Sequence, residues 1–102
     1  MHFNTRSLDP IHPGEILLED FMKPLGISIN HLARDLSVPP NRISGIVNGT
    51  RSVTADTALR LSVYFGVSPE TWLSLQVSYD IRVARRERGV EIRRQVRKRT
   101  AA

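Results

Sequence analysis

Residues 29–49 read INHLARDLSVPPNRISGIVNG and predict two short helices joined by a tight turn. Ser28 is a good N-cap, and the apolar residues after it repeat at helical spacing: Ile29, Leu32, Ala33 and Leu36. The residue before a proline avoids the α region, so Pro39 is expected outside a helix and Pro40 at the first position of the second helix. Gly49 is expected to end that helix, because glycine accepts the left-handed conformation.

The second helix of this pair has one apolar and one polar face. With the first helix and the turn, its apolar face predicts a shared core of Leu32, Leu36, Val38, Ile43, Ile46 and Val47. Its other face presents Asn41, Ser44 and Asn48, flanked by Arg42 and Gly45. A short helix with such a face can enter the DNA major groove, where Arg reads guanine and Asn reads adenine. Arg51 and its neighbours follow in a loop of the type that holds phosphates.

Any surface helix turns polar residues outward, and helix pairs occur in many bundles. An ordinary helix pair is therefore the alternative to a DNA-reading one. The tight turn, the small Ala33, the short second helix and Arg51 together favour DNA reading.

Three further helices are expected around this pair, and no strand is indicated. The first begins at His12-Pro13-Gly14-Glu15 and is expected to break at Pro24, which cannot continue it. Thr54 caps a helix over residues 55–65, with inward positions at Ala58, Leu59, Leu61, Ser62 and Phe65. Asp56 and Arg60, four residues apart on that helix, are expected to form a weak pair. The result is an all-α chain of five helices.

The last helix opens at Ser68-Pro69-Glu70 and carries a stripe of Trp72, Leu75, Tyr79 and Val83. Trp72 is expected in the core. The apolar positions run past what one core needs, so this helix is our candidate dimer surface. Gly89 weakens the expectation that the helix continues into the basic end of the chain.

Charge is divided unevenly along the 102 residues, whose formal net charge is +5. Residues 81–102 carry nine basic and two acidic side chains, whereas residues 1–80 carry six and eight. We therefore expect an N-terminal arm (1–11), a helical domain (12–85) and a basic C-terminal arm (86–102). Such an arm contacts polyanions, or, as the alternative, only solubilises the chain.

Several function classes are disfavoured by the composition. The absence of cysteine excludes disulfides, thiol chemistry and Cys-type zinc sites. His2, His12 and His31 are too scattered for a metal or catalytic cluster, and His12 is expected to cap or pack. We therefore expect no enzyme, metal or cofactor. No apolar run could span a membrane and no secretory signal is evident, so a cytoplasmic protein is expected.

A family resemblance covers residues 12–85. Leu32-Ala33, Leu36, Val38, Ile43 and Ile46 match the phage-repressor-like (Cro/C1, or XRE) helix-turn-helix pattern. More specific strings resemble HigA-type antitoxins: His12-Pro13-Gly14-Glu15-Ile16-Leu17, Pro24-Leu25-Gly26, Asn41-Arg42-Ile43-Ser44, Ile46-Val47-Asn48-Gly49, residues 54–61, Tyr64-Phe65-Gly66, Ser68-Pro69-Glu70, Trp72-Leu73, Leu75-Gln76 and Tyr79-Asp80.

The resemblance implies a phage-repressor-like five-helix bundle that dimerises and represses its own operon at palindromic operator DNA. It also implies a toxin partner of the HigB type, a RelE-like ribonuclease that cuts mRNA on the ribosome. Carried over by position, DNA contacts fall to Pro39, Pro40, Asn41, Arg42, Ser44, Gly45, Asn48, Thr50 and Arg51. The protein would act in the bacterial cytoplasm, on the nucleoid when it is bound to its operator.

The sequence departs from the family pattern at four positions in this region. Ser37 stands where glycine is common, which predicts a strained or differently shaped turn. Pro40 replaces a polar residue, Gly45 a longer side chain and Thr50 a common lysine. The operator sequence therefore cannot be carried over from the family.

Acidic residues on the first helix give a candidate toxin surface. RelE-like nucleases are typically basic, so Glu15, Glu19 and Asp20 suit such a partner better than the basic arm does. A solvated acidic face is the alternative. For the whole chain, the alternatives are a stand-alone XRE-type transcriptional regulator and a nucleic-acid-associated protein with little sequence preference.

Overall fold

Five helical rods follow one another in the computed structural model, which describes residues 9–100. The first rod joins α1 (Pro13–Ile16), the π-helical η2 (Leu17–Met22) and α2 (Lys23–Leu25). The others are α3 (Ile29–Leu36), α4 (Pro40–Val47), α5 (Ala55–Phe65) and α6 (Pro69–Gln95). No strand occurs among the described residues, so the prediction of five helices and no sheet is confirmed.

The core lies where the first rod, α3, α4, α5 and the start of α6 meet. Its buried members include Leu32, Leu36, Val38, Ile43 and Ile46, as predicted for the α3–α4 pair, whereas the predicted Val47 is half-buried and packs against them. Trp72 is 1% exposed, which confirms it as a core residue. The inward position predicted for Leu59 is wrong, since this side chain is 58% exposed. Successive helix positions diverge by about 100°, and α5 instead buries Thr57, Ala58 and Leu61.

The turn between α3 and α4 has the shape that the sequence predicts. Pro39 is extended, with ψ 143°, and Pro40 is the first residue of α4. Ser37 has φ 58°, the only positive φ at a non-glycine position in residues 9–100. Val38 N donates to Ala33 O at 3.0 Å, which closes α3 around this left-handed residue. The expected strain at Ser37 is therefore present, because a side chain disfavours this backbone region.

The expectation that Pro24 breaks the first helix is wrong. Helical structure continues to Leu25, with Pro24 inside α2. The cause is η2, where an N–H reaches a carbonyl five residues back, as Lys23 N does to Leu18 O. The wider π turn accommodates a residue that lacks an N–H and would crowd an ordinary α turn. The rod ends two residues later at Gly26.

The first rod meets α4 at Gly14, whose close approach to α4 was not predicted. A Cβ on Gly14 would lie 1.7 Å from Ile46 O, so only glycine fits there. His12 caps α1, since its Nδ1 accepts a hydrogen bond from Gly14 N at 2.9 Å. The His12 ring also packs edge-on against Tyr79 of α6, with centroids 4.9 Å apart. The prediction that His12 caps or packs is confirmed on both counts.

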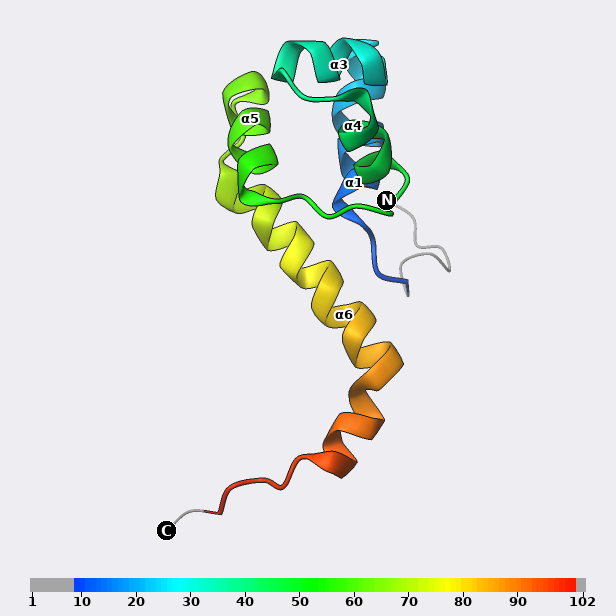
Figure 1. The fold of residues 1–102 in the computed structure, drawn as a ribbon, viewed down its shortest axis with the longest axis vertical. Helices are drawn as coiled ribbons and strands as arrows, with labels where there is room; N and C mark the ends of the chain where they lie inside the picture. The colour runs from blue at the N-terminus through cyan, green and yellow to red at the C-terminus, as the bar shows by residue number, and fades with distance from the viewer. Residues whose placement is uncertain (1–8, 101–102) are drawn as a thin grey trace.

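Helix α6 runs for 27 residues and leaves the bundle partway along its length (Figure 1). Its first part buries Trp72 and Gln76, whereas no side chain of residues 84–95 is buried. Gly89 does not interrupt it, and the helix passes the expected boundary at residue 85 without a break. The division of the chain into a domain and an arm stays a prediction based on charge. None of the helices in residues 9–100 is long and apolar enough to cross a membrane.

Candidate nucleic-acid interface

The nine predicted DNA contacts lie on the start and outer face of α4 and on the loop that follows it. Exposed among them are Pro39, Pro40, Asn41, Asn48, Thr50 and Arg51, whereas Arg42, Ser44 and Gly45 are half-buried. The opposite face of α4 buries Ile43 and Ile46 in the core. Packing of these two side chains presents the polar face outward, as a groove-entering helix requires. That these nine residues contact DNA stays a prediction.

Gly45 supports the loop after α4. Its carbonyl accepts hydrogen bonds from Thr50 N (2.9 Å), Arg51 N (3.0 Å) and Thr50 Oγ1 (3.2 Å). A Cβ on Gly45 would lie 3.1 Å from Arg51 Cβ, so the stem of Arg51 rests directly on the glycine. The departure from the family at Gly45 therefore has a local reason, because it lets Arg51 fold back against α4.

A buried glutamine, which the sequence reading did not single out, holds the far end of the same loop. Gln76 of α6 is 5% exposed, and its Oε1 accepts a hydrogen bond from Val53 N at 2.8 Å. Its Nε2 donates to Asp80 Oδ1 at 3.0 Å. A polar residue four positions after Trp72, on the buried side of the helix, was the available signal. The loop is thus fixed by α4 at one end and by α6 at the other.

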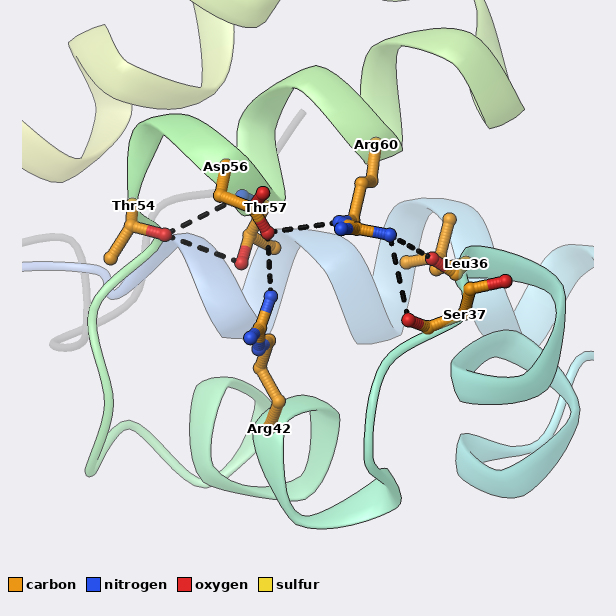
Figure 2. A network of polar contacts seen from close by, with 7 residues as sticks. All are labelled: Leu36, Ser37, Arg42, Thr54, Asp56, Thr57 and Arg60. Atoms are coloured by element: carbon orange, nitrogen blue, oxygen red, sulfur yellow. Dashed lines mark hydrogen bonds and ion pairs between the residues drawn. The ribbon is translucent and has the colours of Figure 1, made fainter.

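Arg42 of α4 is joined to α5 by a carboxylate. Its Nη1 donates to Asp56 Oδ2 at 2.7 Å, and Arg60 Nε donates to the same oxygen at 2.9 Å (Figure 2). The predicted Asp56–Arg60 pair is therefore confirmed, whereas the bond to Arg42 was not predicted. Hydrogen bonds from Arg60 and then Arg42 lower the pKa of the Asp56 carboxyl, so it is charged at neutral pH.

A cavity of about 320 Å³ opens beside this network. Its lining combines arginines from α4, the loop and α5 with three hydroxyl side chains and one carboxylate: Arg42, Arg51, Ser52, Thr54, Asp56, Thr57 and Arg60. Arginine and hydroxyl donors are the groups that contact DNA phosphates. The surface beside α4 therefore carries side-chain donors of the types that contact the phosphate backbone of DNA.

The candidate toxin residues Glu15, Glu19 and Asp20 are all exposed on the first rod. Glu19 pairs with Lys23 at 2.8 Å. Glu15 and Glu19 are expected on one face because they are four residues apart. The π-helical turn of η2 is wider than an α turn, so this alignment is looser than in an α-helix. Their role stays a prediction.

Residues 18–72 match the helix-turn-helix family (HTH_3). Virulence-associated protein I of Dichelobacter nodosus is 50% identical over 78 residues, which span 76% of this chain and 72% of that protein.

Two solved structures are similar over most of the chain. An addiction module antidote protein of the HigA family from Coxiella burnetii has 49% identity and a TM-score of 0.84, covering 89% of this chain and 99% of that one. The antitoxin GraA in complex with its operator has 42% identity and a TM-score of 0.86, covering 99% of each. The protein is therefore a regulator and not an enzyme, and it belongs to the HigA-type antitoxins of the XRE helix-turn-helix family.

Proposed function

We propose that this protein binds palindromic operator DNA as a homodimer and represses its own operon, with α4 as the recognition helix. The observation that carries the proposal is the face of α4, which presents Asn41, Arg42 and Asn48 above a packed core. The structural relative GraA, solved in complex with its operator, supports the same use of this fold. Such a protein acts in the bacterial cytoplasm, on the nucleoid when it is bound to its operator.

The division of labour within the proposed interface follows from the contacts. Asn41 and Arg42 carry the donors that read adenine and guanine, and Pro40 offers only apolar contact, for example to a thymine methyl. Thr50 and Arg51, held against Gly45, are placed to contact phosphates. The two recognition helices of a dimer would meet half-sites about one DNA turn, ~34 Å, apart.

The test compares the DNA upstream of the protein's own gene with a scrambled duplex of equal length. Arg42→Ala is expected to weaken operator binding by roughly 1–3 kcal/mol if the guanidinium reads a base through two hydrogen bonds. Arg94→Ala is the matched control, since it removes an exposed arginine from the basic arm. Equal affinity of the wild-type protein for both duplexes would contradict operator recognition.

The basic arm favours a second candidate, a nucleic-acid-associated protein with little sequence preference. Deletion of residues 86–102 removes seven basic side chains. If all seven contact phosphate, the slope of log K against log salt falls by about 0.9 for each. Operator preference that survives the deletion supports the first proposal, whereas its complete loss supports the second.

We infer that the homodimer forms through α6. A groove of about 400 Å³ on this helix is lined by Glu70, Leu73, Ser74, Val77 and Ser78. Val77 in this groove is 54% exposed, and Ile81, four residues later, is 49% exposed and extends the apolar surface beyond the groove. If α6 of a second copy packs against this surface, each copy covers the exposed apolar side chains of the other. Val77→Asp should yield monomers in analytical ultracentrifugation, whereas Val90→Asp, on the arm, should leave the dimer intact.

We further propose that the protein neutralises a HigB-like, mRNA-cleaving toxin, and that Glu15, Glu19 and Asp20 contact it. Family membership supports the partner, and the exposure of the three acidic side chains supports the surface. Charge reversal of Glu15 and Glu19 should abolish co-purification with a basic RelE-like product of the neighbouring gene. Reversal of Glu87 and Glu91, another exposed pair four residues apart, is the control. A neighbourhood without such a gene would favour a stand-alone regulator.

A further inference from the structure

The carboxylate of Asp56 connects three parts of the helix-turn-helix surface. Asp56 is the second residue of α5, and its Oδ2 accepts hydrogen bonds from Arg42 Nη1 on α4 and from Arg60 Nε (Figure 2). Arg60 Nη1 in turn donates to Leu36 O at 2.9 Å and to Ser37 O at 3.5 Å. The end of α3, the recognition helix and the start of α5 are thereby joined through one oxygen atom.

The network ends at the strained part of the motif. Leu36 is the last residue of α3, where backbone carbonyls lose their helical partners, and Ser37 has the left-handed φ of 58°. The Arg60 guanidinium supplies donors to both carbonyls. Arg60 is therefore fixed at two ends, by Asp56 and by the turn, so the carboxylate of Asp56 is itself held in place.

Arg42 is held at one corner of its guanidinium. Asp56 engages Nη1, and the Arg42 side chain has no other hydrogen bond or ion pair within residues 9–100. The planar guanidinium carries five N–H donors in a fixed fork, so anchoring one corner sets the direction of the others. The Arg42 side chain is 32% exposed, on the wall of the cavity that α4 shares with Arg51 and Thr54. Its remaining donors thus have a defined approach to a partner.

An exposed ion pair of this kind adds little to the stability of a fold. Beside DNA, a carboxylate also repels phosphates and weakens binding to every sequence alike. Asp56 therefore adds little to stability and would be a disadvantage for general DNA affinity. Orientation of a base-reading arginine is a role in which the negative charge is useful despite this repulsion.

We propose that Asp56 is a positioning residue that sets the base specificity of Arg42, an inference that rests on the proposed binding of operator DNA. Asp56 does not contact the DNA itself. It holds the Arg42 guanidinium in the one orientation that meets a guanine edge, and its charge lowers affinity for every DNA sequence alike.

The experiment selects binding sites from duplexes with a randomised central region, using full-length wild-type protein and variants. The wild type is expected to recover a palindrome with guanine at one symmetric pair of positions. Asp56→Asn should raise affinity for scrambled duplex and lower the preference for that guanine about tenfold, while other positions keep their preference. In an Arg42→Ala background, the same substitution should leave base preference unchanged.

Asp56→Glu separates position from charge, because it keeps the negative charge and moves it by one methylene. A positioning role predicts a loss of guanine preference without a rise in affinity for scrambled duplex. Glu91→Gln is the matched charge control, since Glu91 accepts a hydrogen bond from Arg88 at 2.7 Å on the arm, far from α4 along the chain. It should raise general affinity and leave every base preference unchanged.

Three outcomes would overturn the inference. One is Asp56→Asn raising general affinity and leaving every base preference unchanged, as Glu91→Gln is expected to do. Another is Asp56→Asn lowering guanine preference as much in the Arg42→Ala background as alone. The third is weaker binding of Asp56→Asn to every duplex together with a fall in its melting temperature, which would assign the effect to stability. A wild-type protein that selects no sequence contradicts the proposed function itself, and so is distinguished from these results.

Discussion

The two parts of α6 show how one helix can be held by different forces. Residues 69–83 place Trp72 and Gln76 in the core and pack Tyr79 against His12. Residues 84–95 bury no side chain and are supported by exposed pairs such as Arg88–Glu91 at 2.7 Å and Arg86–Asp9 at 2.9 Å. The packed part depends on exact fit, because interiors are close-packed, whereas the projecting part depends on helix propensity and charge. Equal substitutions should therefore have unequal effects in the helical domain, here called the body, and in the arm.

The largest difference is expected for glycine-to-alanine substitutions. Gly14→Ala places a Cβ against the Ile46 carbonyl and should destabilise the fold by more than about 3 kcal/mol, beyond ordinary overpacking, which costs about 1–3 kcal/mol. Gly89→Ala, whose Cβ would lie 3.5 Å from Arg85 Cγ, should stabilise α6 by about 0.5–1 kcal/mol. Urea unfolding of both variants measures the contrast. Similar effects at the two glycines would contradict it.

The next contrast concerns two glutamines on α6. Gln76→Met leaves Val53 N and Asp80 without their partner and should cost about 1–3 kcal/mol, since a buried N–H then lacks an acceptor. Gln95→Met, at the exposed end of the helix, should stay within about 0.5 kcal/mol of the wild type. Thermal unfolding followed by circular dichroism compares the two. A tolerated Gln76→Met would show that the loop after α4 does not depend on α6.

A smaller change in the free energy of unfolding is expected at the turn before α4. Ser37→Gly removes a side chain from a left-handed residue and should stabilise the body by about 1 kcal/mol, because that conformation costs other residues about 1–2 kcal/mol. Ser78→Gly, within α6, is the opposing control and should destabilise by about 0.5 kcal/mol. Chemical unfolding of both variants gives the sign. A destabilising Ser37→Gly would mean that the serine contributes more than its strained backbone costs.

The smallest expected effect is a dependence of stability on pH, which arises from His12 in the body. Burial lowers the pKa of His12 below its usual 6.5, so the unfolded chain binds a proton before the folded one does. Stability is fully present above pH 6.5 and is lost as the pH falls below it. His12→Asn retains a capping acceptor and should flatten this slope between about pH 7 and 5. Parallel slopes for the two proteins would assign the pH dependence to other groups.

Elements whose ends depend on local chemistry were predictable. Ser28, Thr54 and Ser68 cap α3, α5 and α6 as expected, each through a hydrogen bond within its own first turn. Pro39-Pro40 places the start of α4 correctly. Pro24 was misplaced because α-helical bonding was assumed, whereas the π turn of η2 changes which carbonyls need a donor. Local rules succeed only where the local hydrogen-bond pattern is the ordinary one.

The candidate interface divides in a similar way. Its nine residues follow from the spacing of α4 and from the family resemblance, because both depend on positions close together in the chain. The residues that support them did not follow: Asp56 is 14 positions from Arg42, and Gln76 is 23 positions from Val53. Nothing in the sequence near either pair specifies its partner. The requirement for glycine at position 14 was not predictable for the same reason, since the backbone that it contacts belongs to α4.

The sequence alone thus determined five helices, the apolar face of each packed pair, the outward face of α4 and the separation of charge between body and arm. These properties depend on residues within a turn or two of one another. The tertiary structure decided which carboxylate holds Arg42, what fixes the loop of Arg51, and where α6 stops being part of the core. Each of these depends on atoms brought together from distant parts of the chain, and only the packing of the whole body sets their distances.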